Sequence, residues 1–94
     1  MMLELDGRLM MDRGTLHDLL AAKLDFPEYY GRNLDALYDL LSESEAEIVV
    51  THSVDLTVNL GAYGVAFLKV LADAADENTS LTVKICENFL DNEK

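Results

Sequence analysis

Short runs of apolar residues predict three β-strands. Leu3 and Leu5 alternate with acidic residues before the turn signal Asp6-Gly7, which predicts a short first strand. The β-branched run Ile48-Val49-Val50 is typical of a central strand that is buried on both faces. Residues 81–85 alternate apolar and polar side chains again, so they predict a third strand with one buried face.

Two helices are predicted between the first and second strands. Thr15 followed by Asp18 resembles a capping box, so a first helix is expected to start there and to end before Phe26-Pro27. Asn33 is a good N-cap for a second helix over residues 34–41. We therefore expect a loop to connect the first helix to the second.

Two further helical segments are predicted between the second and third strands. Residues 54–63 can hold a short helix before Gly64, and residues 65–77 place apolar side chains at helical spacing up to the stop signal Asn78. Strands that are separated by helices require crossover connections. We therefore expect an α/β fold in which helices pack on a small parallel sheet.

Length and composition narrow the class of protein. The chain has 94 residues, enough for one modest core, so we expect a single domain over residues 1–90 and a polar tail at residues 91–94. No apolar run approaches the roughly 20 residues of a membrane span, and the first eleven residues lack the features of a signal peptide. The one cysteine, Cys86, lies in an apolar run and is expected to be a small buried side chain. These features predict a cytoplasmic protein that does not bind membranes.

Acidic residues dominate the charge of the chain. Eighteen Asp and Glu against seven Lys and Arg give a formal net charge of −11. Such a negative field repels nucleic acid and attracts basic partners, although acidic charge can also serve solubility alone. The position of the acids must decide between these two interpretations.

The predicted second helix separates its leucines from its acids. At 100° per residue its four leucines fall within about 120° of arc, and Asp35 and Asp39 fall on the opposite side. Asp35 lies in the first turn, where the helix dipole favours a carboxylate. The helix dipole does not account for Asp39, which lies beyond the first turn. Repulsion between two like charges four residues apart typically costs an isolated helix about 0.2 to 0.5 kcal/mol. Both a solvated face and a binding face fit this pattern.

Three tyrosines surround these acids. Tyr29, Tyr30 and Tyr38 lie within ten residues of one another, in a chain with only 4 Tyr and 3 Phe. Tyrosine offers a large contact area with little rotamer entropy to lose, and binding surfaces are enriched in it. We expect Tyr30 to cover the edge of the core, because Gly31 allows close packing, and Tyr38 to lie between core and solvent.

Residues 27–39, Pro-Glu-Tyr-Tyr-Gly-Arg-Asn-Leu-Asp-Ala-Leu-Tyr-Asp, resemble the signature segment of the barstar family, and the order of predicted elements fits that family. The resemblance implies a three-stranded parallel sheet packed with about four helices in two layers. It implies an inhibitor that inserts its second helix and the preceding loop into the active site of a basic, extracellular-type ribonuclease. We expect this inhibitor to act as a monomer, without a cofactor and without catalysis of its own.

The resemblance also implies roles for individual residues. Asp39 would be the central anion that faces the catalytic basic groups of the enzyme, and Asp35 would support it. Tyr29 would pack on the rim of the active site. Asn33 and the backbone of Gly31 would add hydrogen bonds.

Two further contacts are less closely matched to the family. Tyr38 stands where the family commonly has tryptophan, and a second tryptophan has no counterpart in residues 42–45, since this chain has none. The contact surface on the partner is therefore expected to differ. The family's further acid maps onto Asp73, although a surface ion pair with Lys69 explains that residue as well.

Arg32 is a positive charge within an otherwise acidic segment. It can pair with Asp35 or Glu28, or it can meet an acid on the partner. Its role is left open by the sequence.

Catalytic and metal-binding motifs are not recognised in the sequence. His17, His52 and Cys86 have no motif spacing with one another, and each histidine is expected to satisfy a hydrogen bond. Asp35 and Asp39 alone are too few ligands for calcium, so no metal site is predicted. The alternative to a ribonuclease inhibitor is an acidic interaction module that keeps the fold and binds a different basic protein.

Overall fold

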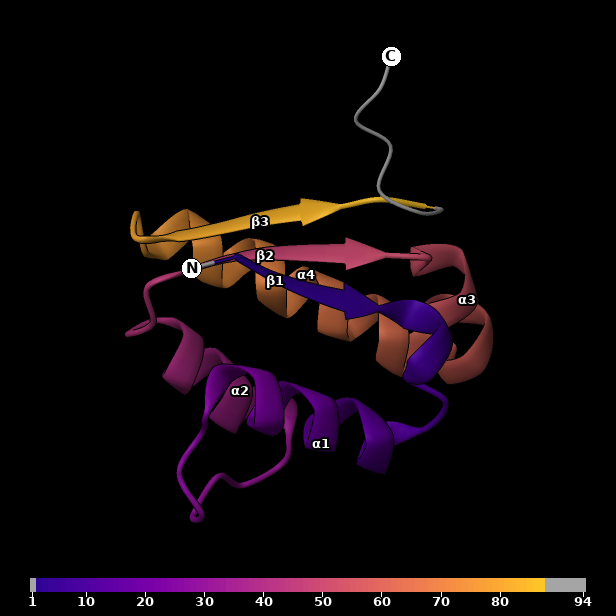
Figure 1. The fold of residues 1–94 in the computed structure, drawn as a ribbon, viewed down its shortest axis with the longest axis horizontal. Helices are drawn as coiled ribbons and strands as arrows, with labels where there is room; N and C mark the ends of the chain where they lie inside the picture. Colours follow the sequence, from indigo (N-terminus) through magenta and orange to yellow (C-terminus); the bar gives the residue numbers. More distant parts are fainter. Residues whose placement is uncertain (1, 88–94) are drawn as a thin grey trace.

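The structure is a computed structural model that describes residues 2–87. Within this range the chain forms β1 (Met2–Asp6), the 3-10 helix η1 (Gly7–Leu9), α1 (Arg13–Leu24), α2 (Leu34–Leu41), β2 (Ala46–Thr51), α3 (Ser53–Leu60), α4 (Ala62–Glu77) and β3 (Leu81–Ile85) (Figure 1). The predicted polar tail, residues 91–94, lies outside the described residues.

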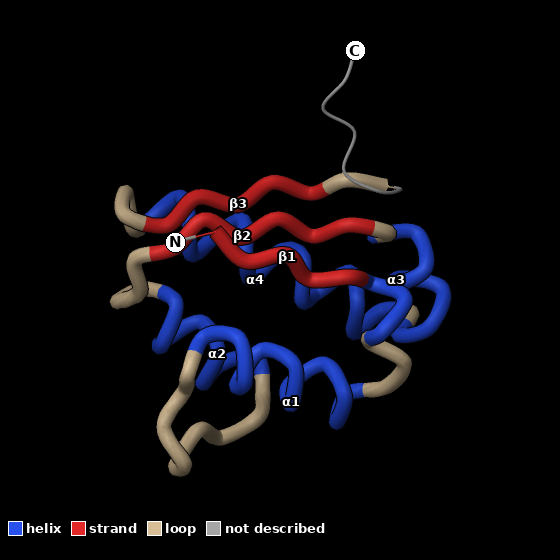
Figure 2. Tube along the Cα trace, viewed as in Figure 1, coloured by secondary structure: helices blue, strands red, loops and turns tan. Residues whose placement is uncertain are grey.

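The three strands form one parallel sheet in the order β1-β2-β3. Leu5 of β1 pairs with Val50 of β2, which pairs on its other side with Ile85 of β3. Helices α1 and α2 connect β1 to β2, and α3 and α4 connect β2 to β3. Figures 1 and 2 show α1, α2 and α4 on one side of the sheet and α3 beyond the end of β2. The predicted two-layer α/β fold is therefore confirmed.

The core lies between the sheet and the helices. It consists of apolar side chains that are almost completely removed from water: Leu5, Met10, Leu16, Leu20, Tyr30, Leu37, Leu41, Ala46, Ile48, Val50, Leu56, Phe67, Leu71, Ala74 and Leu81. Val49 points to the other face of the sheet from Ile48 and is also only 2% exposed. The run Ile48–Val50 of the central strand is thus buried on both faces, as its β-branched side chains predict, whereas Glu47 at the start of the strand is exposed.

Helix α1 begins earlier than the sequence predicts. Its N-cap is Asp12, whose carboxylate accepts a hydrogen bond from the Thr15 backbone N–H at 2.8 Å. The Thr15 hydroxyl accepts in return from the Asp12 N–H at 3.0 Å, which completes a capping box. The predicted box with Asp18 is wrong because Thr15 occupies the third helical position of the box rather than its cap. The helix ends at Leu24, before Phe26, as predicted.

The break between α3 and α4 falls at Gly61 and not at Gly64. Gly61 has φ 59° and ψ −132°, a backbone conformation that residues with a Cβ rarely adopt. Gly64 lies inside α4, where a Cβ would come within 3.1 Å of the Leu56 carbonyl oxygen. Gly61 therefore makes the turn, and Gly64 permits close packing of the two helices. The predicted end of α4 before Asn78 is confirmed.

The third strand is confirmed, but the side chains on its inner face become more exposed to solvent toward its end. Leu81 is buried, Val83 is half-buried, and Ile85, the last residue of this edge strand, is 41% exposed. Cys86 is half-buried and not fully buried as predicted, because strand alternation directs it to the sheet face that the helices leave open. Its N–H donates to the Val50 carbonyl at 2.7 Å, so the backbone pairing continues there.

Candidate functional site

The start of α2 is fixed by Asn33, as predicted. The side-chain oxygen of Asn33 accepts a hydrogen bond from the Ala36 N–H at 2.8 Å, which caps the helix. The side-chain nitrogen of the same residue donates to the Gly31 carbonyl at 3.2 Å. One side chain thus ties the helix to the preceding loop.

The other end of α2 is held by Asn78, which follows α4. The Asn78 amide nitrogen donates to the carbonyl oxygens of Leu41 at 3.0 Å and Ser44 at 2.8 Å. The Asn78 oxygen accepts from the Ser80 N–H at 3.0 Å. With Leu37 and Leu41 fully buried, α2 is anchored along one side and at its end. This helix is a rigid support for whatever its exposed face carries.

Asp35 and Asp39 lie on that exposed face, as the helical periodicity predicts. Within residues 2–87, no lysine, arginine or histidine lies within 4.0 Å of either carboxylate. Their four-residue spacing places them one helical turn apart on the same side. Two like charges are therefore held close together with no neutralising partner among the described residues, an arrangement that favours the approach of a cation.

A hollow of about 160 Å³ opens beside Asp39. Its lining comes from α2 and from the connection between α1 and α2: Tyr29, Tyr30, Gly31, Ala36, Asp39 and Leu40. We call this connection, residues 25–33, the binding loop; Figure 2 shows it in tan, projecting beyond α1 and α2. Tyr29 is 85% exposed on it. A Cβ on Gly31 would lie only 3.2 Å from the Ala36 Cβ, so glycine lets the loop approach the helix closely.

Tyr30 anchors the binding loop in the core, as predicted. It is 8% exposed, its ring packs on Phe26 with centroids 4.8 Å apart, and its hydroxyl is hydrogen-bonded to Nδ1 of His17. The other ring nitrogen of His17 lies 2.7 Å from the hydroxyl of Tyr63 on α4. A neutral imidazole donates from one nitrogen and accepts at the other, so His17 joins the loop to α4 through α1.

Two members of this hydrogen-bonded chain, His17 and Tyr30, are kept uncharged near neutral pH by their surroundings. Burial lowers the pKa of His17, and the nearby Arg32 guanidinium lowers it further. Burial also raises the pKa of Tyr30 to about 12. Both histidine and tyrosine therefore act as hydrogen-bonding groups of the scaffold, and the expected hydrogen bond of His17 is confirmed.

Arg32 takes a partner that the sequence does not indicate. Its Nη1 lies 2.7 Å from Oδ1 of Asp18, and its Nη2 donates to the Gly14 carbonyl at 3.2 Å. Both groups belong to α1, whereas the predicted partners Asp35 and Glu28 form no ion pair in the described part of the chain. The pairing is non-local because the binding loop folds back along α1.

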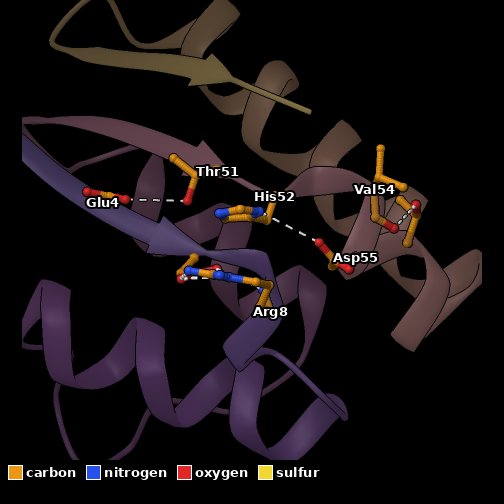
Figure 3. A network of polar contacts seen from close by, with 8 residues as sticks. Glu4, Arg8, Thr51, His52, Val54 and Asp55 are labelled. Atoms are coloured by element: carbon orange, nitrogen blue, oxygen red, sulfur yellow. Dashed lines mark hydrogen bonds and ion pairs between the residues drawn. The ribbon is translucent and has the colours of Figure 1, made fainter. Parts of the chain in front are cut away.

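A second polar cluster lies at the other end of the molecule, where β1 and β2 end (Figure 3). Arg8 pairs with Asp6 at 2.8 Å, and this hydrogen bond lowers the pKa of the Asp6 carboxyl. His52, with φ 54°, has its Nδ1 3.7 Å from Oδ2 of Asp55. That distance is too long for a hydrogen bond, so the one expected for His52 is not found among residues 2–87. These contacts lie at the carboxyl ends of β1 and β2, away from α2.

The comparisons with known proteins identify the family of this chain. The family described as Barstar (barnase inhibitor) matches residues 1–86. The chain belongs to the barstar family. It is also 41% identical, over 76 residues covering 78% of this chain and 84% of the relative, to the Bacillus subtilis (strain 168) protein named "Putative ribonuclease inhibitor YrdF".

In this barstar-family chain the predicted binding residues do not all meet in one place. The hollow brings together Tyr29, Gly31 and Asp39, with Asn33 behind it as the helix cap. Asp35 lies one turn away on the open face, and Tyr38 is half-buried between core and solvent, as expected. The contributions of these residues to binding stay predictions.

Asp73 lies on the exposed side of α4 and pairs with Lys69 at 3.1 Å. The ion pair that the sequence indicates is thus present, and a role of Asp73 toward a partner stays a prediction. The supporting residues Asp18, Tyr63 and Asn78 were missed as contacts of the site. Each is far in sequence from its partner, and no spacing rule links residues across elements.

Two chemical properties of the described residues bear on function. In residues 2–87, no group of three or more His, Cys, Asp and Glu side chains is arranged to hold a metal ion. None of the helices in that range combines the length and apolar character of a membrane span.

Proposed function

We propose that this barstar-family protein is a ribonuclease inhibitor without catalysis of its own, and that its target is a basic, extracellular-type enzyme related to barnase. The observation that carries the proposal is a pair of carboxylates, Asp35 and Asp39, that form no ion pair within residues 2–87 and lie on a rigid helix beside the hollow edged by Tyr29. The family match and the printed name of the relative support the same role.

The mechanism follows from the chemistry of the target. A ribonuclease must present cationic groups to bind the phosphates of RNA, and carboxylates on a preorganised helix can occupy the same positions. Asp39 would sit among these cations with Asp35 one turn away. The hollow beside Asp39 has apolar walls and one carboxylate, which suits a cationic side chain of the enzyme.

The loop residues would define the edge of the contact. Tyr29, 85% exposed, would lie flat against the rim of the active site. Gly31 and Asn33 would offer backbone and side-chain hydrogen bonds, and Tyr38 and Asp73 would contact the enzyme further out. We also propose that the protein acts as a cytoplasmic monomer, a location with which the free thiol of Cys86 is compatible.

Electrostatic attraction would speed the encounter. The net charge of −11 repels RNA and attracts a basic enzyme, and such steering weakens with salt because screening shortens the range of the field to about 8 Å at physiological ionic strength. The test is to titrate the protein into a barnase-type ribonuclease assay at low and physiological salt. We expect stoichiometric inhibition that weakens as salt is raised.

The decisive comparison is between two single-charge variants. Asp39→Ala should weaken inhibition by about 30-fold or more, since truncating one partner of a buried charge pair costs about 2 to 5 kcal/mol. Glu47→Ala removes the same charge from the open face of the sheet and should change inhibition little. Equal losses in both variants would contradict the mechanism. Absence of inhibition by the wild type would favour the alternative, an acidic module with a different basic partner.

A further inference from the structure

The binding loop is attached to the rest of the molecule at two points of different character. Tyr30 is buried and its attachment is part of the core. Arg32 lies two residues later, is exposed, and reaches back to α1. Gly31, which lines the hollow, lies between these two attachments.

The geometry of Arg32 is that of a clamp. Its two terminal nitrogens contact groups one helical turn apart on α1, the carboxylate of Asp18 at 2.7 Å and the carbonyl of Gly14 at 3.2 Å. A planar guanidinium can hold two such points at once, which an ammonium cannot do in the same way. Arg32 also has φ 57°, a left-handed conformation that is uncommon for a residue with a long side chain. Such strained conformations persist where surrounding contacts hold them.

We propose that Arg32 is a positioning residue for the binding loop, which it holds against α1 through Asp18 and Gly14 so that the edge of the hollow is already formed before a partner arrives. This inference rests on the proposed function. Arg32 then contributes to inhibition without touching the enzyme: a preorganised loop loses less conformational freedom on binding, and the complex dissociates more slowly.

Charge and positioning predict different kinetics. Removing Arg32 makes the binding face more negative, so a basic enzyme should associate slightly faster. Replacing Asp18 with Asn makes that face less negative, so association should be slightly slower. Both changes weaken the clamp, since Arg32→Ala removes both of its contacts and Asp18→Asn removes the ion pair. If positioning is the role of Arg32, both variants must therefore raise the dissociation rate although they shift the association rate in opposite directions.

The experiment measures both rate constants against a purified barnase-type ribonuclease for the wild type, Arg32→Ala, Asp18→Asn and the double variant. Alanine keeps the Cβ, so the strain at φ 57° is unchanged. We expect each single variant to dissociate about two- to five-fold faster, the range of an exposed ion pair, and the double variant to dissociate no faster than Arg32→Ala. Arg8→Ala is the matched control, since it breaks a comparable Arg–Asp pair at the other end of the molecule and should leave dissociation unchanged.

A second measurement needs no partner. The Tyr30 N–H donates to the Pro27 carbonyl at 3.0 Å within the loop, so its hydrogen exchange in the free protein reports loop opening. Arg32→Ala and Asp18→Asn should both speed this exchange by a similar factor, and Arg8→Ala should not.

The outcomes separate the two proposals. Faster dissociation in Arg32→Ala alone, with Asp18→Asn unchanged, would mean that Arg32 contacts the enzyme directly, and it would overturn the inference. Unchanged dissociation and exchange in both variants would do the same. A wild-type protein that does not bind the ribonuclease would overturn the proposed function, and the exchange rates would still decide whether the clamp holds the loop.

Discussion

Asn78 is expected to be a key stabilising residue although it lies outside the helices and strands. Replacing it with alanine removes two hydrogen bonds to the carbonyls of Leu41 and Ser44 and one from the Ser80 N–H. A net contribution of about 1 kcal/mol per bond gives an upper value of about 3 kcal/mol. Because Asn78 is only half-buried, water can replace part of this, and we expect a loss of about 2 kcal/mol. In a domain of this size that lowers Tm by about 8 to 16 °C.

The assay is urea unfolding of Asn78→Ala, with Asn59→Ala as the matched control. Asn59 is exposed on α3 and forms no side-chain hydrogen bond with the described residues, so its replacement should change the free energy of unfolding by less than about 0.5 kcal/mol. A loss in Asn78→Ala that is no larger than in the control would refute the reasoning. It would mean that the carbonyls at the end of α2 are satisfied equally well by solvent.

Three other predictions follow from single features. Gly61→Ala should destabilise the protein by about 1 to 3 kcal/mol in urea unfolding, since nothing crowds a Cβ there and only the backbone at φ 59° opposes it; an unchanged midpoint would contradict the assigned turn. The folded pKa of His17 lies below its ordinary value of 6.5, so the free energy of unfolding should be fully retained above pH 6.5 and should fall as the pH drops from there toward the lower folded pKa. This pH dependence should be absent in His17→Gln, and its persistence in that variant would assign it to other groups. Tyr29→Ala should leave urea unfolding unchanged, because the ring is 85% exposed, and should weaken ribonuclease inhibition by about 30-fold; weaker folding with equal inhibition would show the opposite role.

The parts of the fold that the sequence predicts well are those with local causes. Helix α2 has the predicted bounds, because Asn33 caps it and its leucines repeat at helical spacing. The errors occur where a local sequence signal allows two interpretations. Thr15 can serve as a cap or as the third residue of a capping box, and Gly61 and Gly64 are both possible breaks, so the choice depends on backbone geometry and packing that the sequence pattern does not contain.

The candidate site shows the same division. The exposed acids of α2 follow from periodicity, and Tyr30 was expected in the core because of its neighbour Gly31. The supports of the site were not predictable in this way, since His17 and Tyr63 are 46 residues apart, and Arg32 lies in the binding loop whereas its partner Asp18 lies in α1. Such pairs become neighbours only when α1, the binding loop and α4 pack together.

The order of the elements along the chain determines when the site can form during synthesis of the protein. A ribosome that has synthesised residues 1–45 has delivered the whole binding loop and α2, but not β2, with which both β1 and β3 pair. Tyr63 and Asn78, which hold the loop and the end of α2, emerge later still. The acidic face of α2 can therefore be held in place only after β2 and α4 have also been synthesised. A chain cut short by a nonsense codon or by proteolysis before that point would contain most of the residues of the site without the site itself.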